Sequence, residues 1–160
     1  MKIGIIGIGL IGSSLAQAFL QSDSKAEILV CDHNIEHLET ARDMGLGNAF
    51  TPHSEDAARE CDVLFICIPV RSMGKLVSEM APYLTPGTIV TDVGSVKSTV
   101  IQDVEPHIPD DCFFVPGHPV AGLEASGPEK GFATLFENRS YVFTPCSRTT
   151  PESLEKVRTL

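Results

Sequence analysis

The amino-acid sequence predicts an α/β fold with a doubly wound, mainly parallel sheet. Short apolar runs alternate along the chain with segments in which apolar residues recur at helical spacing. The connections between these runs and segments are short, and several runs stop at a glycine, a proline or an aspartate. This alternation is typical of strands joined by crossover helices, which produce a parallel sheet covered by helices.

Six apolar runs are the candidates for strands. The run at residues 63–68 is continuous and stops at Pro69, which indicates a strand buried on both faces. The run at residues 48–51 is the weakest candidate. In chain order the predicted strands are 3–6, 28–31, 48–51, 63–68, 88–91 and 112–115.

Helical spacing recurs between the predicted strands, in five segments. Ser54 is placed to cap the third helix and Ser95 the fifth, because a serine hydroxyl accepts from free N–H groups at a helix start. The predicted helices are 10–20, 35–44, 54–60, 73–80 and 95–104. Residues 116–139 are predicted as a long loop, which in a compact domain is usually functional or mobile. Another helix begins at Pro151, and no partner is evident for its apolar face.

Composition excludes several classes of protein. The 160 residues carry a formal net charge of −9, from 12 lysines and arginines against 21 aspartates and glutamates. The cations do not cluster, so we expect no nucleic-acid partner. No apolar run reaches the roughly 18 residues that a membrane span needs, so we expect no membrane association.

The five cysteines show no C-x-x-C spacing, which favours neither a zinc site nor a thioredoxin-like pair. Cys31 and Cys67 lie beside or within apolar runs, where a cysteine is usually a small buried hydrophobe. We therefore expect no metal, and a reduced, cytoplasmic setting. A secretory signal is disfavoured because glycines interrupt the apolar stretch after Lys2.

A glycine-rich motif follows the first predicted strand and opens the first predicted helix. Its G-x-G-x-x-G pattern consists of Gly7, Ile8, Gly9, Leu10, Ile11 and Gly12. In this context the pattern predicts a Rossmann-type dinucleotide site, in which the glycines allow a tight turn, close approach to a pyrophosphate and close helix–strand packing. Unpaired N–H groups at the helix start would bind the phosphates. Pro69, at the end of a neighbouring strand, is expected to line the same site.

Asp32 ends the second predicted strand, 20 residues after Gly12. A carboxylate there accepts hydrogen bonds from the adenosine ribose and repels a 2′-phosphate, which favours NAD over NADP. The alternative is a local role as a cap of the helix that starts near Asn34, and the two roles are compatible.

His118 differs from the other four histidines, which lie in polar surface segments or near a turn. It follows a predicted strand end and precedes Pro119, where a dehydrogenase needs a base facing the nicotinamide. A structural loop histidine remains the alternative. Ser95 and Lys97, after another strand end, either belong to a helix start or lie over the substrate, with Lys97 near an anion.

Four stretches together resemble the prephenate/arogenate dehydrogenase family. They are GIGLIG, VTDVGSVKS, GHPVAGLEASGPE and LFENRSYVFTP, and the resemblance covers nearly the whole chain. The first stretch is general to dinucleotide folds, and the second and third are specific. The resemblance implies an NAD-dependent oxidoreductase of tyrosine biosynthesis that oxidatively decarboxylates prephenate to 4-hydroxyphenylpyruvate, or arogenate to tyrosine.

The resemblance also implies roles for individual residues. His118 would bond the ring 4-hydroxyl and take its proton as hydride leaves the same carbon. Ser95 would bond the same hydroxyl and His118, and Lys97 would lie near the active site. Glu124, just after the H-P-x-A-G motif, would act as a polar gate.

The family normally carries a C-terminal helical domain that dimerises and supplies cations for the substrate carboxylates. We therefore expect residues 1–150 to form the dinucleotide-binding domain and residues 151–160 to begin a helix of a helical domain that is missing or truncated. Arg71, Lys97 and Arg139 are the few candidate cations in the chain. We expect the chain alone to be poorly active, and the longer enzyme to be a homodimer.

Two alternatives remain open from the sequence. One is a hydroxyacid dehydrogenase of similar domain plan, which would leave the GHPVAG segment unexplained. The other is a non-catalytic module that senses a dinucleotide. The choice between prephenate and arogenate also stays open.

Overall fold

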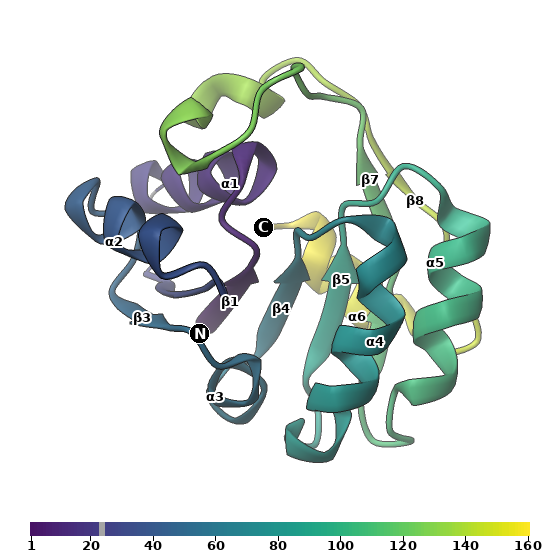
Figure 1. Ribbon diagram of the computed structural model, residues 1–160. Coiled ribbons are helices and arrows are strands. Elements are labelled where there is room, and N and C mark those ends of the chain that lie inside the picture. Colours follow the sequence, from purple (N-terminus) through teal and green to yellow (C-terminus); the bar gives the residue numbers. More distant parts are fainter. Residues whose placement is uncertain (23–24) are drawn as a thin grey trace.

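The computed structural model describes residues 1–22 and 25–160, and its centre is a six-stranded sheet with helices on both faces (Figure 1). Neighbouring strands are all parallel, in the order β3-β2-β1-β4-β5-β6. Their bounds are β1 Lys2–Ile6, β2 Glu27–Cys31, β3 Ala49–Thr51, β4 Val63–Ile66, β5 Ile89–Asp92 and β6 Phe113–Val115. The order reverses between β1 and β4, so the predicted doubly wound, Rossmann-type fold is confirmed.

The described residues form six α-helices. They are α1 Leu10–Gln21, α2 Ile35–Asp43, α3 Ser54–Glu60, α4 Val70–Met80, α5 Lys97–Val104 and α6 Pro151–Arg158. The first five correspond to the five predicted helices, with shifted ends. α4 begins at Val70 rather than at residue 73, because Pro69 directly precedes it and a proline suits a helix start.

Both predicted serine caps are wrong. α5 begins at Lys97 with Val96 in the cap position, and the Gly94 N–H donates to the Asp92 carboxylate, which holds the intervening chain in a turn. Ser95 therefore lies outside the helix. α3 has His53 in the cap position without a side-chain cap bond, so Ser54 is already inside the helix.

Each face of the sheet has its own apolar core. The core under α3, α4 and α5 includes Met73 and Val100. The core under α1, α2 and α6 includes Leu15 and Val157. Along β1, Ile3 and Ile5 belong to the core on the α1 side and Ile6 belongs to the other core, as the pleat of a strand requires.

α6 packs against the sheet rather than projecting from it. Thr150 and Ser153 form a capping box that fixes its start. Val157 is buried, and Leu154 and Leu160 pack beside it in the core on the α1 side. The apolar face for which no partner was evident therefore has one. The assignment of residues 151–160 to a second domain stays a prediction.

Residues 116–143 contain structure that the sequence did not predict. β7 Gly117–Pro119 and β8 Tyr141–Phe143 form a separate antiparallel pair, with His118 opposite Val142. Between them, two 3₁₀ turns, Pro128–Lys130 and Ala133–Phe136, return over α1 (Figure 1).

Side chains of α1 hold this returning segment in place. The Gln17 Nε2 group donates to the Gly131 carbonyl at 2.9 Å, and the Phe132 N–H donates to Ser14 Oγ at 3.1 Å. A Cβ on Gly131 would lie 2.0 Å from Ser13 Oγ, so this close approach to α1 needs a glycine. The part of the predicted loop between β7 and β8 is thus anchored to the helix that follows the glycine-rich motif.

Candidate nucleotide-binding and catalytic site

The three motif glycines meet three different spatial demands. Gly7 has φ +95°, and a Cβ there would lie 2.7 Å from the Cys67 carbonyl oxygen. A Cβ on Gly12 would lie 2.0 Å from the Gly7 carbonyl oxygen, so α1 packs directly on the turn. A Cβ on Gly9 would meet nothing within 4 Å. The backbone at Gly9 is therefore open to a ligand, whereas Gly7 and Gly12 serve the turn and the packing.

The N-terminus of α1 is suited to bind an anion. Gly9 occupies its cap position, and no side chain caps the helix. The N–H groups of Leu10, Ile11 and Gly12 in the first turn have no partner within the helix, and the helix dipole is positive at this end. A 12-residue helix with an uncapped, glycine-rich start provides the donors that a pyrophosphate accepts.

Asp32 lies at the end of β2 and is 7% exposed. One carboxylate oxygen accepts from the Ile8 N–H at 2.8 Å, and the other accepts from the Asn34 N–H at 2.9 Å. The cap of α2 is Asn34, which accepts from two N–H groups of the first turn. Asp32 thus supports the start of α2 without capping it, and its oxygens keep lone pairs for a ligand hydroxyl.

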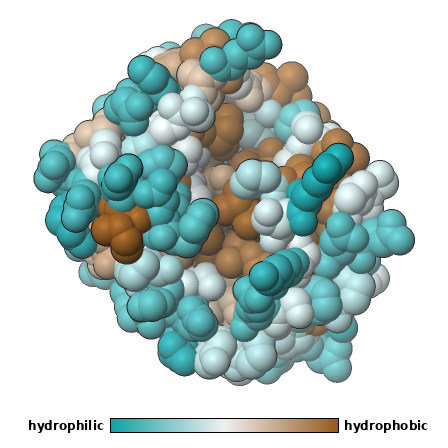
Figure 2. Space-filling model, viewed as in Figure 1, coloured by the Kyte–Doolittle hydropathy of each residue, from teal (hydrophilic) through white to brown (hydrophobic). Residues whose placement is uncertain are grey.

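A pocket of about 480 Å³ opens at the carboxyl ends of β1, β2 and β4. Figure 2 shows a hollow with apolar side chains at its floor in the middle of the face that Figure 1 presents. Apolar and polar residues share the lining of the pocket, which consists of Ile6, Cys31, His33, Pro52, Ser54, Ile68, Pro69, Ser72, Lys75, Leu76 and Glu79. Pro69 therefore lines this crevice, and its contact with a cofactor stays a prediction.

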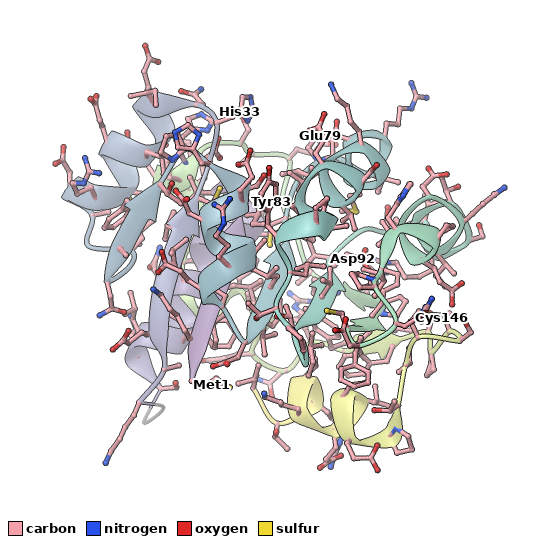
Figure 3. The ribbon with its side chains drawn as sticks, turned by 90° about the horizontal axis from the view of Figure 1, so that it is seen from below. Met1, His33, Glu79, Tyr83, Asp92 and Cys146 are labelled. Atoms are coloured by element: carbon pink, nitrogen blue, oxygen red, sulfur yellow. The ribbon has the colours of Figure 1, made fainter. Side chains whose placement is uncertain are left out.

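Asp92 and Lys97 form an ion pair at the end of β5. Asp92 is 1% exposed and lies inside the molecule near α5 (Figure 3). Its carboxylate accepts from the Lys97 ammonium and from the N–H groups of Gly94 at 2.8 Å and Gly117 at 3.2 Å. Burial raises the pKa of Asp92 and lowers the pKa of Lys97, and contact between the two charges opposes both shifts.

His118 occupies the middle of β7 and is half-buried. The contacts of Gly117 with Asp92 bring β7 to the carboxyl end of β5. In the part of the chain that the structure describes, the side chains of His118 and Ser95 make no hydrogen bond, with each other or with another residue. Glu124 lies exposed in the segment between β7 and β8. The structure thus brings Lys97 close to the backbone beside His118, and the roles of Ser95 and Glu124 stay predictions.

Two residues of this site had no predicted role: Asp92, which the sequence places only at a strand end on the ligand-binding edge, and Tyr141, which it does not single out. Asp92 ends an apolar strand and starts the stretch D-V-G-S-V-K, which is a usable signal. The Tyr141 hydroxyl donates to the Asp92 carbonyl at 3.3 Å, and its ring packs against Gly117. Burial raises the pKa of Tyr141 well above its ordinary value. No local pattern in the sequence predicts the contact of Tyr141 with Asp92.

Two further properties bear on the class of protein. In residues 1–22 and 25–160, no helix combines the length and the apolar character that a membrane crossing requires. The same residues contain no group of three or more histidines, cysteines or acidic residues that could hold a metal ion.

Comparison with known proteins shows the family of the chain. The family model described as the nucleotide-binding domain of prephenate dehydrogenase matches residues 15–160. Among curated proteins, a cyclohexadienyl dehydrogenase of Zymomonas mobilis is 39% identical over 95% of this chain and 52% of its own length. A prephenate dehydrogenase of Bacillus subtilis is 29% identical over 98% of this chain and 42% of its own.

Two solved structures of prephenate or arogenate dehydrogenases match nearly the whole chain. Prephenate dehydrogenase from A. aeolicus, in complex with hydroxyphenyl propionate and NAD⁺, matches 99% of this chain and 55% of its own with a TM-score of 0.90 and 31% identity. Synechocystis arogenate dehydrogenase matches 99% and 55% with a TM-score of 0.91 and 31% identity. The chain spans about half the length of the curated relatives named above.

Proposed function

The chain belongs to the prephenate dehydrogenase family, and on that premise we propose that it is the NAD-binding domain of an enzyme that oxidatively decarboxylates prephenate or arogenate. The observation that carries the proposal is the position of His118. It lies on β7, which Gly117 ties to the carboxyl end of β5, at the same sheet edge as the glycine-rich loop. Ligands of open α/β sheets bind at this edge.

The residues present fit a dinucleotide. The open backbone at Gly9 and the uncapped start of α1 would hold the pyrophosphate, and Asp32 would accept from the ribose hydroxyls. Pro69 would line the crevice. A carboxylate at Asp32 favours NAD over NADP, because a 2′-phosphate would face a negative charge. When bound, NAD supplies a nicotinamide ring that accepts a hydride.

The chain's own task in the reaction is to remove a proton. The His118 imidazole accepts the proton of the substrate's ring hydroxyl while the carbon that bears this hydroxyl gives up a hydride. The carboxylate on the opposite carbon of the same ring leaves as carbon dioxide, its bonding electrons make the ring aromatic, and the phenolate oxygen that results takes a proton back. Ser95 orients the same hydroxyl, and Glu124 gates the entrance. Much of the acceleration comes from holding the reacting carbon against the cofactor.

The location and assembly of the protein follow from the same proposal. A biosynthetic dehydrogenase of this class works in the cytoplasm, and the five described free thiols suit a reducing compartment. At its natural full length the enzyme is a homodimer whose further residues bind the substrate carboxylates.

The test is a turnover assay of the protein at its natural full length, with prephenate and arogenate, each against NAD and NADP. We expect reduced cofactor to form with at least one of the two substrates, and faster with NAD. A protein that binds NAD but turns over neither substrate would contradict the proposal.

A further inference from the structure

Lys97 faces the interior of the protein rather than the expected substrate site. Its side chain is 12% exposed. The ammonium group donates to the Asp92 carboxylate and, at 2.6 Å, to the Gly117 carbonyl. Two of its three donors are therefore used within the protein, and its charge is balanced by Asp92. A substrate carboxylate would have to compete with a buried carboxylate that is already in contact.

The ion pair holds both polar backbone atoms of Gly117. The Gly117 N–H donates to Asp92 Oδ1 at 3.2 Å, and its carbonyl accepts from Lys97. On the remaining side, a Cβ at Gly117 would lie 2.5 Å from the ring of Tyr141, so the ring packs directly against the glycine. The Tyr141 hydroxyl in turn donates to the Asp92 carbonyl. Gly117 is thus fixed at its N–H, its carbonyl and its Cα.

Fixing the backbone of Gly117 also affects His118, which is the next residue of β7. Because side chains alternate along a strand, the imidazole points to the face opposite the Tyr141 ring. His118 is paired with Val142, which is 46% exposed, so the imidazole lies on an accessible face. Once the backbone of Gly117 is fixed, the direction in which the His118 side chain leaves the strand is fixed as well.

Burying an ion pair has a large desolvation free energy. Taking each ion out of water costs several kcal/mol, which the attraction between the two charges must offset, so such pairs are weak evidence for stability. Their best-attested value is to specify one arrangement. Here the pair specifies how β7 sits on the end of β5, with its polar contacts on the residue before the expected base.

We propose that Asp92 and Lys97 are positioning residues, which clamp the backbone of Gly117 and thereby aim the His118 imidazole, and that Lys97 is not a ligand of the substrate carboxylates. This inference rests on the proposed function, because it takes His118 as the base. The same proposal makes Tyr141 a positioning residue, because its ring packs against the Cα of Gly117.

Steady-state kinetics of the protein at its natural full length separate the two roles of Lys97. For Lys97→Met we expect kcat to fall by about tenfold to a hundredfold, the usual consequence of misplacing a reacting group. The KM for the organic substrate should change by less than about threefold. Lys97→Arg keeps a cation with several donors and should recover part of the loss. Lys156→Met, on the exposed face of α6, is the matched control and should behave as wild type.

A tenfold rise in KM with kcat unchanged would overturn the inference in favour of an anion ligand. Wild-type kinetics for Lys97→Met would also overturn it. If Lys97→Met does not fold, Asp92→Asn takes its place, since the amide oxygen still accepts from Gly117 but the charge pair is lost. The same fall in kcat at constant KM is expected.

A second measurement does not depend on turnover. In the 160-residue chain, amide hydrogen exchange at Gly117 should quicken by about tenfold in Lys97→Met, because its carbonyl loses a donor and Asp92 loses its counter-charge. NAD affinity, measured by calorimetry on the same samples, should stay within about threefold. A wild-type chain that fails to bind NAD would defeat the proposed function alone. Unchanged exchange at Gly117 would defeat the clamp alone.

Discussion

The Asp32 carboxylate accepts a hydrogen bond of 2.8 Å from the Ile8 N–H, which joins the end of β2 to the middle of the glycine-rich loop. Its other oxygen accepts from the Asn34 N–H at 2.9 Å. The side chain expected to recognise the ribose therefore also shapes the loop expected to bind the pyrophosphate. A substitution that removes the charge of Asp32 together with its acceptor oxygens should therefore also change the conformation of the glycine-rich loop.

Replacing Asp32 should change cofactor choice. Asp32→Ala removes a hydrogen bond to the loop, so NAD should bind at least about tenfold more weakly. It also removes the charge that faces a 2′-phosphate, so the difference in affinity between NAD and NADP should become smaller. Calorimetric titration with both cofactors measures this. Asp32→Asn, which keeps one acceptor for the Ile8 N–H, separates the loop effect from the charge effect. An unchanged NAD/NADP affinity ratio in Asp32→Ala would mean that Asp32 is not the ribose ligand.

Two glycines of the motif should respond to alanine in opposite ways. Gly12→Ala places a Cβ 2.0 Å from the Gly7 carbonyl oxygen, so the free energy of unfolding should fall by about 1–3 kcal/mol or more. Gly9→Ala meets no protein atom within 4 Å and should fold normally, but its methyl group would occupy the space of the pyrophosphate and weaken NAD binding. Urea unfolding and NAD titration of both variants check this. A Gly9→Ala protein that binds NAD as wild type does would place the phosphates elsewhere.

Glu105 should contribute to stability only when it is ionised. The hydroxyl and N–H of Ser147 donate to its carboxylate at 2.6 and 2.8 Å, and these bonds hold the pKa of Glu105 below its ordinary value. The stabilisation is therefore fully present above the unfolded-state pKa of 4.5 and is lost as the pH falls through the lower folded-state value.

Glu105→Gln should accordingly lower the free energy of unfolding at neutral pH by less than about 1 kcal/mol, because the group is largely solvated. The difference from wild type should shrink below pH 4.5. Urea unfolding at several pH values measures it, with Glu39→Gln on the exposed side of α2 as the control. A difference that is constant with pH would assign the effect to something other than the charge.

The parallel sheet was predictable because its strands are local apolar runs. The strand Val63–Ile66 is buried on both faces and contains no polar residue, so its sequence is a continuous apolar run that is easy to identify. The ends of the strands were harder to predict. The predicted strand ran to residue 68, but β4 ends at Ile66, which pairs with Asp92, the last residue of β5. That limit is set by pairing between segments rather than by the sequence of either.

The strand that carries His118 was not predictable from local pattern. β7 has three residues, and two of them, Gly117 and Pro119, are poor strand formers. Its partner begins at Tyr141, beyond two 3₁₀ turns. The ion pair was missed for a related reason. Asp92 and Lys97 are close in sequence, but their shared target, Gly117, lies 25 residues from Asp92.

We propose that His118 is the base of the reaction. This role is tested by the pH dependence of kcat for wild type and His118→Asn at saturating NAD, in the protein at its natural full length. His107→Asn, outside the site, is the control. Ser95→Ala should lose less rate than His118→Asn, because a serine orients the hydroxyl but carries no proton away.

For wild type we expect the rate to fall on the acid side, since an imidazole that is already protonated cannot accept a proton. His118→Asn should be slower by about 10² to 10⁴-fold and should lose that acid limb, with substrate binding affected far less. A His118→Asn enzyme within about threefold of wild type, with the acid limb intact, would contradict the account and make His118 a structural residue of β7.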